Sequence, residues 1–172
     1  AYTGGIVGKT SSSSNTLSTV RDCYNQGQVY HSGSWSETAY VGGIIGYSFS
    51  TISRCYNSGV VHANTNTVSS AHLGGIAGSG ISSSSVSNSA VMRSQISGGT
   101  SCYIISGAGV KENNIAYSGL TVTNDATSTY NINEFYGEGL YSEKLSWDFS
   151  YIWISYESQY HELRYIDSEI EE

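Results

Sequence analysis

Sequence repeats are the feature that most narrows what this chain can fold into. The heptapeptide YTGGIVG starts at Tyr2, and close copies start at Tyr40 (YVGGIIG) and His72 (HLGGIAG). A fourth, decayed copy, YIISGAG, starts at Tyr103. The copies are 38, 32 and 31 residues apart, and a period in this range indicates a repeat architecture in which neighbouring units stack.

A second signature follows the first within each repeat. It reads VRDCYNQG up to Gly27, ISRCYNSG up to Gly59, VSNSAV from Val86 and NNIAYSG up to Gly119. Each repeat thus contains three short apolar pieces separated by Gly, Asn and Ser, a pattern typical of short strands joined by turns. Three strands in about 31 residues predict one coil of a three-sided parallel β-helix. An α-solenoid needs helical periods that are missing here, and a β-propeller needs four strands in a longer blade.

The predicted fold is all-β: a right-handed parallel β-helix, or solenoid, of about four coils with an aromatic C-terminal cap. Residues 1–120 form the coils, residues 121–166 form a capping segment packed on the last coil, and residues 167–172 form an acidic tail. We expect a short helix near residues 131–145. Trp147, Phe149, Ile152 and Trp153 are expected to cover the open end of the core, because unpaired strand edges favour association.

Stacking of the coils also predicts which side chains lie inside. Val7, Ile44 and Ile76 recur near the paired glycines and should point inward as an aliphatic ladder. Cys23 and Cys55 fall at the same place in successive repeats, and we expect both thiols in the core. The chain has three cysteines and no CxxC pair, which argues against a disulfide framework and against a zinc site.

Charge excludes two classes of partner. The net charge is −7, charged residues make up 12% of the chain, and Lys and Arg do not cluster. Binding to nucleic acid or to an anionic membrane surface is therefore not expected. No apolar stretch approaches the roughly 18 residues that a membrane-spanning helix needs, so no membrane insertion is predicted.

These motifs resemble the GLUG repeat family, whose pattern is roughly Gly-Gly-Leu/Ile-Val/Ala-Gly, a Ser/Gly/Asn stretch, Ile-x-x-Cys-Tyr, and Gly followed by Val. Residues 42–46 with 52–60 match both halves, and residues 74–78 match the first half, with Ser89 in place of the cysteine. The stretch LSWDFSYIW at 145–153 is similar to the segment that often closes GLUG arrays in gut bacteria. The Pro-x-Leu that family members place later reads HEL at 161–163.

The resemblance implies a bacterial secreted or surface-anchored protein, often an adhesin-like polypeptide. Some relatives are IgA-specific metalloendopeptidases that carry these repeats beside a catalytic domain. The expected location is therefore extracellular or at the bacterial cell surface. The chain reaches a repeat signature by Gly4, and its first strand would be an open edge, so we expect further repeats of the same polypeptide N-terminal to Ala1.

Residues that could carry chemistry are sparse. His161 and Glu162 begin an HExxH zinc motif, but position 165 is Tyr instead of the second ligand. His62 and His72 flank one loop without a third ligand nearby. Carboxylates before residue 125 are limited to three, in three different phases of the repeat: Asp22, Glu37 and Glu112. We therefore predict no enzyme, no catalytic residue, no metal site and no cofactor.

Aromatic residues give the remaining functional signal. Tyr30, Trp35 and Tyr40 lie in or beside the loop HSGSWSETAY, where an exposed Trp could stack on a sugar or anchor a protein. The alternative is that the loop buries Trp35 against a coil face.

The first hypothesis is a non-enzymatic structural or adhesion module of a larger bacterial surface or secreted protein, with a host surface protein or glycan as partner. A carbohydrate-binding module using exposed Tyr and Trp is the alternative, and a β-helix polysaccharide-degrading enzyme is the second alternative.

Overall fold

The strands of successive repeats stack in register. The computed structural model describes residues 1–11, 17–33, 35–64, 68–92, 95–123, 125–136, 138–155 and 162–163. The first coil contains β1 (Tyr2–Gly4), β2 (Val7–Lys9), β3 (Ser18–Arg21), β4 (Tyr24–Asn25) and β5 (Val29–His31). The second contains β6 (Trp35–Gly42), β7 (Ile45–Ser48), β8 (Ser50–Ser53), β9 (Tyr56–Asn57) and β10 (Val61–Ala63). The third contains β11 (Val68–Gly74), β12 (Ala77–Gly80), β13 (Ser85–Ser87), β14 (Ala90–Val91) and β15 (Ile96–Ser97).

The elements after the third coil first add strands to the stack and then form the C-terminal segment. After the third coil come β16 (Ser101–Tyr103), β17 (Val110–Glu112), β18 (Ile115–Tyr117) and β19 (Ser128–Tyr130). The C-terminal part contains a 3₁₀ helix, η1 (Ile132–Tyr136), the helix α1 (Glu138–Leu145), and the strands β20 (Trp153–Ile154) and β21 (Glu162–Leu163). These two helices confirm the helical segment predicted near residues 131–145. Neither is long enough to cross a membrane, and no other helix occurs in the described ranges.

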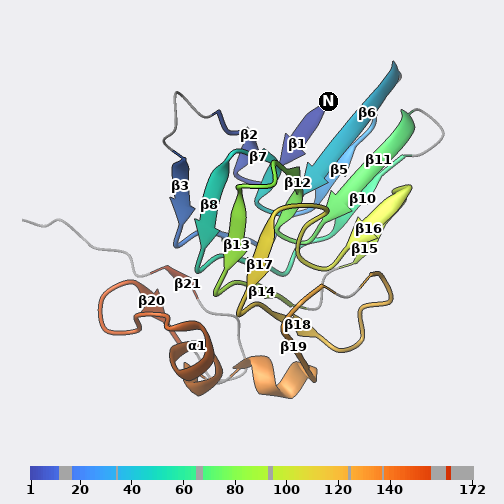
Figure 1. The fold of residues 1–172 in the computed structure, drawn as a ribbon. Coiled ribbons are helices and arrows are strands. Elements are labelled where there is room, and N and C mark those ends of the chain that lie inside the picture. The colour runs from blue at the N-terminus through green and yellow to red at the C-terminus, as the bar shows by residue number, and fades with distance from the viewer. Residues whose placement is uncertain are drawn as a thin grey trace, which may run out of the picture.

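All five sheets of the stack are parallel. Their strand orders are β1-β6-β11-β16, β15-β10-β5, β12-β7-β2, β17-β13-β8-β3 and β19-β18-β14-β9-β4. In the first sheet Tyr2 pairs with Tyr40 and Tyr40 pairs with His72, so the register is the one in which the heptapeptides align. Figure 1 shows the strands of each sheet running side by side along the stack. The prediction of an all-β parallel β-helix is confirmed.

Each of the first three coils holds five short strands where three were expected. Two sharp bends per coil explain the difference. At the first bend a Cβ on Gly42 would collide with the carbonyl oxygen of Ile45, so only glycine permits the turn between β6 and β7. At the second bend Arg54, between β8 and β9, has a left-handed backbone with φ 49°. The same left-handed position recurs at Asp22, Asn88 and Asn113.

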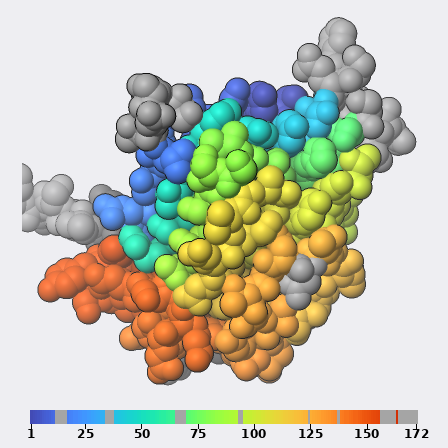
Figure 2. Space-filling model, viewed as in Figure 1, coloured from blue at the N-terminus to red at the C-terminus, as the bar shows by residue number. Residues whose placement is uncertain are grey.

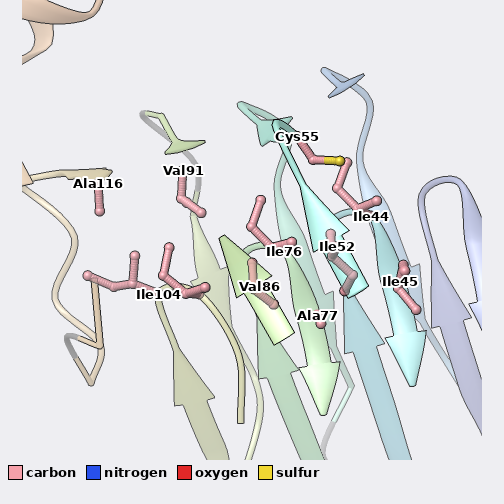
Figure 3. Close-up of a cluster of buried hydrophobic side chains, with 11 residues drawn as sticks. Ile44, Ile45, Ile52, Cys55, Ile76, Ala77, Val86, Val91, Ile104 and Ala116 are labelled. Atoms are coloured by element: carbon pink, nitrogen blue, oxygen red, sulfur yellow. The ribbon is translucent and has the colours of Figure 1, made fainter. Parts of the chain in front are cut away.

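The core is built from aliphatic ladders (Figure 3). Ile44, Ile45 and Ile76 are fully buried, and Val7 packs against the same cluster from the first coil, on the rung of Ile45. Side chains alternate along residues 39–41 of β6, so Ala39 and Val41 are buried while Tyr40 faces outward. The predicted inward positions of Ile44 and Ile76 are confirmed. The placement of Val7 in the same ladder was wrong, because the register pairs Val7 with Ile45, and Val7 is only partly buried.

The cysteines and asparagines of the second signature form shorter ladders. Cys55 is fully buried as expected, whereas Cys23 of the first coil is only half-buried. Asn25 donates from Nδ2 to Oδ1 of Asn57 at 2.8 Å, which links the two coils through their side chains. Gly59 donates its backbone N–H to the same Asn57 oxygen.

Residues 120–123 and 125–126 close the far end of the core. Leu120, Val122 and Ala126 pack against the aliphatic cluster, below the last inward side chains. The carboxylate of Asp125 accepts the backbone N–H groups of Ile105 and Ser106 at 2.7 and 3.0 Å. Asp125 thus supplies the hydrogen-bond acceptors that a further strand would otherwise provide.

The aromatic C-terminal segment lies along the side of the stack. Trp153 packs on Tyr24 of the first coil and Tyr56 of the second, and Trp147 donates its indole N–H to the carbonyl of Asn88 in the third. The tryptophan contacts therefore run across the sheet that ends in β4, where we expected them on the last coil. Figure 2 shows this segment, in orange and red, covering the lower side of the stack. The predicted acidic tail, residues 167–172, lies outside the described residues.

Candidate functional site on the outer aromatic ladder

Outward side chains of the first sheet stack along the axis of the molecule. The rings of Tyr2 and Tyr40 lie 5.8 Å apart, centroid to centroid, with an interplanar angle of 12°. Tyr40 and His72 follow at 5.4 Å and 14°. We call these three residues, from β1, β6 and β11, the outer aromatic ladder. It exists because the register of the parallel strands places equivalent residues of each repeat directly beside one another.

Further side chains pack against this ladder. Tyr47 in β7 meets the rings of Tyr2 and Tyr40 edge-on, at 5.6 and 4.8 Å, and packs on Phe49. The ammonium group of Lys9 lies 4.7 Å from the centre of the Tyr2 ring and 5.5 Å from that of Phe49. Such cation–π contacts hold the lysine against the aromatic surface.

This arrangement limits what the ladder can bind. Aromatic platforms that hold sugars offer a free ring face. Here the faces of Tyr40 are turned toward Tyr2 and His72, and Lys9 lies over the ring of Tyr2. Ring edges and hydroxyl groups are what remain for solvent. The ladder therefore strengthens the contact between coils more than it prepares a flat platform for a ligand.

The three predicted binding residues do not form one site. Tyr40 is the middle ring of the outer aromatic ladder. Tyr30 belongs to another sheet, is 47% exposed and stacks on His62 at 5.3 Å. The backbone of Trp35 is part of β6, but its side chain lies outside what the structure describes.

Sequence reasoning missed most of the cluster around Tyr40. Tyr2 was visible as the first residue of the first heptapeptide, so the alignment alone could have placed it in the ladder. Lys9 and Tyr47 occupy the same register position two residues after the rung of Val7 and Ile45. Since Lys9 and Tyr47 are different residue types, the alignment gives no sign that they share a surface.

The histidines take structural positions. His62 hydrogen-bonds through Nδ1 to Oγ of Ser97 at 3.0 Å, and His31 through Nδ1 to Oγ1 of Thr3 at the same distance. Burial lowers the pKa of His31 below its ordinary value, and the positive chain terminus adds to this effect. His62 and His72 stack in separate ladders. His161 of the incomplete HExxH motif lies outside the described residues.

Two carboxylates, Asp22 and Asp125, are tied to neighbouring groups. Asp22 binds Arg54 of the next coil through two hydrogen bonds of 2.6 and 2.7 Å, which raises the pKa of the guanidinium. Asp125 holds two backbone N–H groups and lies 3.6 Å from the ammonium of Lys111. Within the described ranges no three His, Cys, Asp or Glu side chains gather in a group that could hold a metal ion.

A pocket of about 280 Å³ lies near the closed end of the stack. It is lined by Gln95, Ile96, Ser97, Gly119, Leu120, Thr121 and Val122. None of these residues carries a charge or a nucleophilic thiol, and the Ser97 hydroxyl is already bonded to His62. The pocket therefore offers an amide and hydroxyl groups, from Gln95, Ser97 and Thr121, but no ionisable side chain.

The fold is similar to that of a solved bacterial structure. The crystal structure of a "putative immunoglobulin A1 protease" from Bacteroides ovatus matches with a TM-score of 0.69 at 20% sequence identity. The match covers 95% of this chain and 53% of that one, so this chain spans about half the length of the matched structure. No protein-family model and no curated protein matches the sequence.

Proposed function

We propose that this chain is a non-enzymatic structural or adhesion module of a larger bacterial protein that is secreted or displayed on the cell surface. One observation carries the proposal: polar and aromatic side chains of successive coils are engaged with each other along the axis. The outer aromatic ladder, the Asn25–Asn57 pair and the Asp22–Arg54 pair each join neighbouring coils. Side chains used in this way stiffen the stack, and they do not converge on a bound substrate.

Two further facts support a role within a larger protein. The matched Bacteroides ovatus structure is nearly twice as long as this chain, and it is described as a "putative immunoglobulin A1 protease". A stiff stack of coils is well suited to holding another domain at a distance from a cell. The resemblance to GLUG repeats agrees with an extracellular setting.

The absence of catalysis is tested directly by turnover. We expect no hydrolase or lyase activity when the 172-residue chain is incubated with acidic and neutral polysaccharides and with immunoglobulin A1 itself. Product formation would be followed by reducing-end and peptide mass analysis. Cleavage of any of these substrates, lost in no-protein controls, would place the chain among the enzymes and end this proposal.

Weak glycan binding is the second candidate, and it rests on Tyr30. This ring is 47% exposed and is stacked on His62, so one of its faces is already covered. A glycan array with the unmodified chain should give weak signals at most. Those signals should fall with Tyr30→Ala and persist with His72→Ala, which alters the other ladder. Tight binding unaffected by Tyr30→Ala would show that another surface is used.

A further inference from the structure

The sheet made of β15, β10 and β5 ends one coil earlier than its neighbours. After the third coil β16, β17 and β18 each add a strand to another sheet, and an isolated bridge joins Ala77 of β12 to Ser106. In the described part of the chain no strand is added beside β15. After β18 the chain passes through residues 119–122 to Thr123, which donates its N–H to the carbonyl of Cys102 at 3.1 Å. Residues 119–122 therefore run past β15 without pairing with it.

The backbone of β15 is consequently unpaired on one side. Val61 of β10 lies opposite Ile96 in the parallel register and donates its N–H to the carbonyl of Gln95 at 2.8 Å. Alternate residues of a strand direct their N–H and C=O groups to opposite sides, so those of Ile96 point away from β10. Within the described ranges no hydrogen bond engages either group, although Ile96 is only 5% exposed. Buried backbone groups need partners, so this edge favours a ligand that both donates and accepts.

The pocket of about 280 Å³ lies along this edge. Residues 95–97 line one part of it and residues 119–122 the other, and we call it the β15 pocket. The amide of Gln95 and the hydroxyl of Thr121 join the free N–H and C=O of Ile96 there. Each of these groups is neutral, and together they offer several donors and several acceptors.

The lining indicates the class of ligand. No lining residue carries a charge, so a charged ligand would lose its hydration without gaining a counter-charge. The volume is just below the range of about 300–1,000 Å³ that is usual for ligand pockets, so the ligand is small. Leu120 and Val122 supply an apolar part of the lining. A sugar ring combines hydroxyl groups that donate and accept with C–H groups that pack on apolar side chains.

We propose that the β15 pocket binds one neutral sugar residue of a glycan. One sugar hydroxyl accepts the N–H of Ile96 and a neighbouring hydroxyl donates to its C=O, while Gln95 and Thr121 bind further hydroxyls. The proposal rests on the proposed function and deepens it, because it gives the adhesion module a ligand class. The site is separate from the exposed ring of Tyr30, which lies on β5, at the opposite end of the same sheet.

The test is a titration of the ¹⁵N-labelled 172-residue chain followed by NMR. The probes are the methyl glycosides of glucose, galactose, mannose, fucose, N-acetylglucosamine and N-acetylgalactosamine. We expect at least one of them to shift the amide signal of Ile96 saturably, together with signals of residues 119–122. Methyl glucuronide, which carries a carboxylate, should not shift them.

A blocked tripeptide, acetyl-Thr-Val-Thr-amide, distinguishes a sugar from an added strand, because an extended peptide could also pair with the edge of β15. Shifts of Ile96 by this peptide and by none of the sugars would overturn the proposal. So would an unshifted Ile96 signal with every probe, or equal binding of the glucuronide and the neutral glycosides.

Two variants test the polar groups of the lining. Thr121→Val and Gln95→Leu keep the side-chain volume but remove hydrogen-bonding atoms. Each should weaken the binding of the responding sugar about fivefold, the effect of losing one neutral hydrogen bond. Thr129→Val, at an exposed threonine of β19 outside the pocket, is the matched control and should leave binding unchanged. Unchanged affinity in both pocket variants would overturn the proposal.

Tyr30→Ala separates this site from the exposed ring on β5. The response of Ile96 should persist in this variant, and its loss would show that the sugar is held at Tyr30 instead. Cleavage of a substrate by the chain would refute the proposed function without altering the titration of Ile96. Failure of the titration would leave the structural role of the stacked coils intact, so the two proposals can fail separately.

Discussion

The two ends of this β-helix are built from the same repeat but meet solvent in different ways. At the first coil Ile6 is half-exposed, and within the described residues no strand pairs with the outer edges of β1 to β5, while at the other end Leu120, Val122 and Ala126 cover the core. Asp125 completes the hydrogen bonding there with a carboxylate, paired with Lys111. Closing the end of a solenoid therefore takes specific polar groups as well as apolar side chains. The backbone amides at that end need hydrogen-bond acceptors, and the core side chains need to be buried.

Removing the closed end altogether should have the largest effect. A chain that stops after Leu120 loses Asp125, the apolar cover and the tryptophan segment, leaving open strand edges at both ends. We expect it to aggregate in size-exclusion chromatography with light scattering. A chain ending at Leu163, which keeps every described element, is the control and should stay soluble. A soluble, monomeric 1–120 chain with β-type circular dichroism would contradict this.

Trp153→Ala tests how strongly the C-terminal segment supports the open end. The indole is fully buried and packs on Tyr24 of the first coil. Its removal should lower the free energy of unfolding by about 3–5 kcal/mol. Tyr151→Ala, at a side chain that is 76% exposed, should change it by about 0.5 kcal/mol or less. Similar values for the two variants in urea unfolding would show that the segment is not firmly packed.

Ile44→Ala and Ile6→Ala compare one residue type at one repeat position in two coils. Ile44 is fully buried, so its truncation should cost about 3 kcal/mol. Ile6 of the first coil is half-exposed, and its truncation should cost under about 1 kcal/mol. Chemical unfolding followed by tryptophan fluorescence gives both values. Equal losses of stability would show that Ile6 is as well covered as Ile44.

Asp125→Ala probes the polar part of the closure. The change leaves the N–H groups of Ile105 and Ser106 without the carboxylate and should cost about 2 kcal/mol. Asp125→Asn keeps one acceptor oxygen and should cost less. Glu112→Gln alters an exposed carboxylate nearby and should be close to neutral. An unchanged melting curve for Asp125→Ala would show that the two amides find water at no cost.

The smallest effect on stability is expected for Cys23 and Cys55. Their thiols should nevertheless differ clearly in reactivity. A hydrogen bond from Cys55 lowers the pKa of Cys23 to about 7 against the opposing effect of burial, while the same contact and full burial raise the pKa of Cys55. Alkylation of Cys23 should therefore rise with pH and level off above 7, falling about tenfold for each unit below. Cys55 should react after denaturation alone. Native-state labelling of Cys55 in a Cys23→Ser chain would contradict this.

The repeats predicted much of the fold because a stacked coil depends on local patterns that recur. The register of Tyr2, Tyr40 and His72 follows from aligning the heptapeptides, and so does the inward position of Ile44 and Ile76. Glycine at position 42 could also be assigned to a bend, because a Cβ there meets backbone. The five strands per coil were not predicted, since the left-handed residue at the second bend varies from Asp22 to Arg54 to Asn88.

By itself, the sequence determined that this chain is a parallel β-helix, because each coil repeats the same short strands and the same buried positions. Tertiary structure alone decided where the ends of that stack are closed and what lies against its side. Trp147 meets Asn88 across 59 residues of sequence, and Asp125 meets Ile105 across 20, with no repeat to signal either contact. Such contacts occur once in the molecule, so only the packed structure brings their partners together.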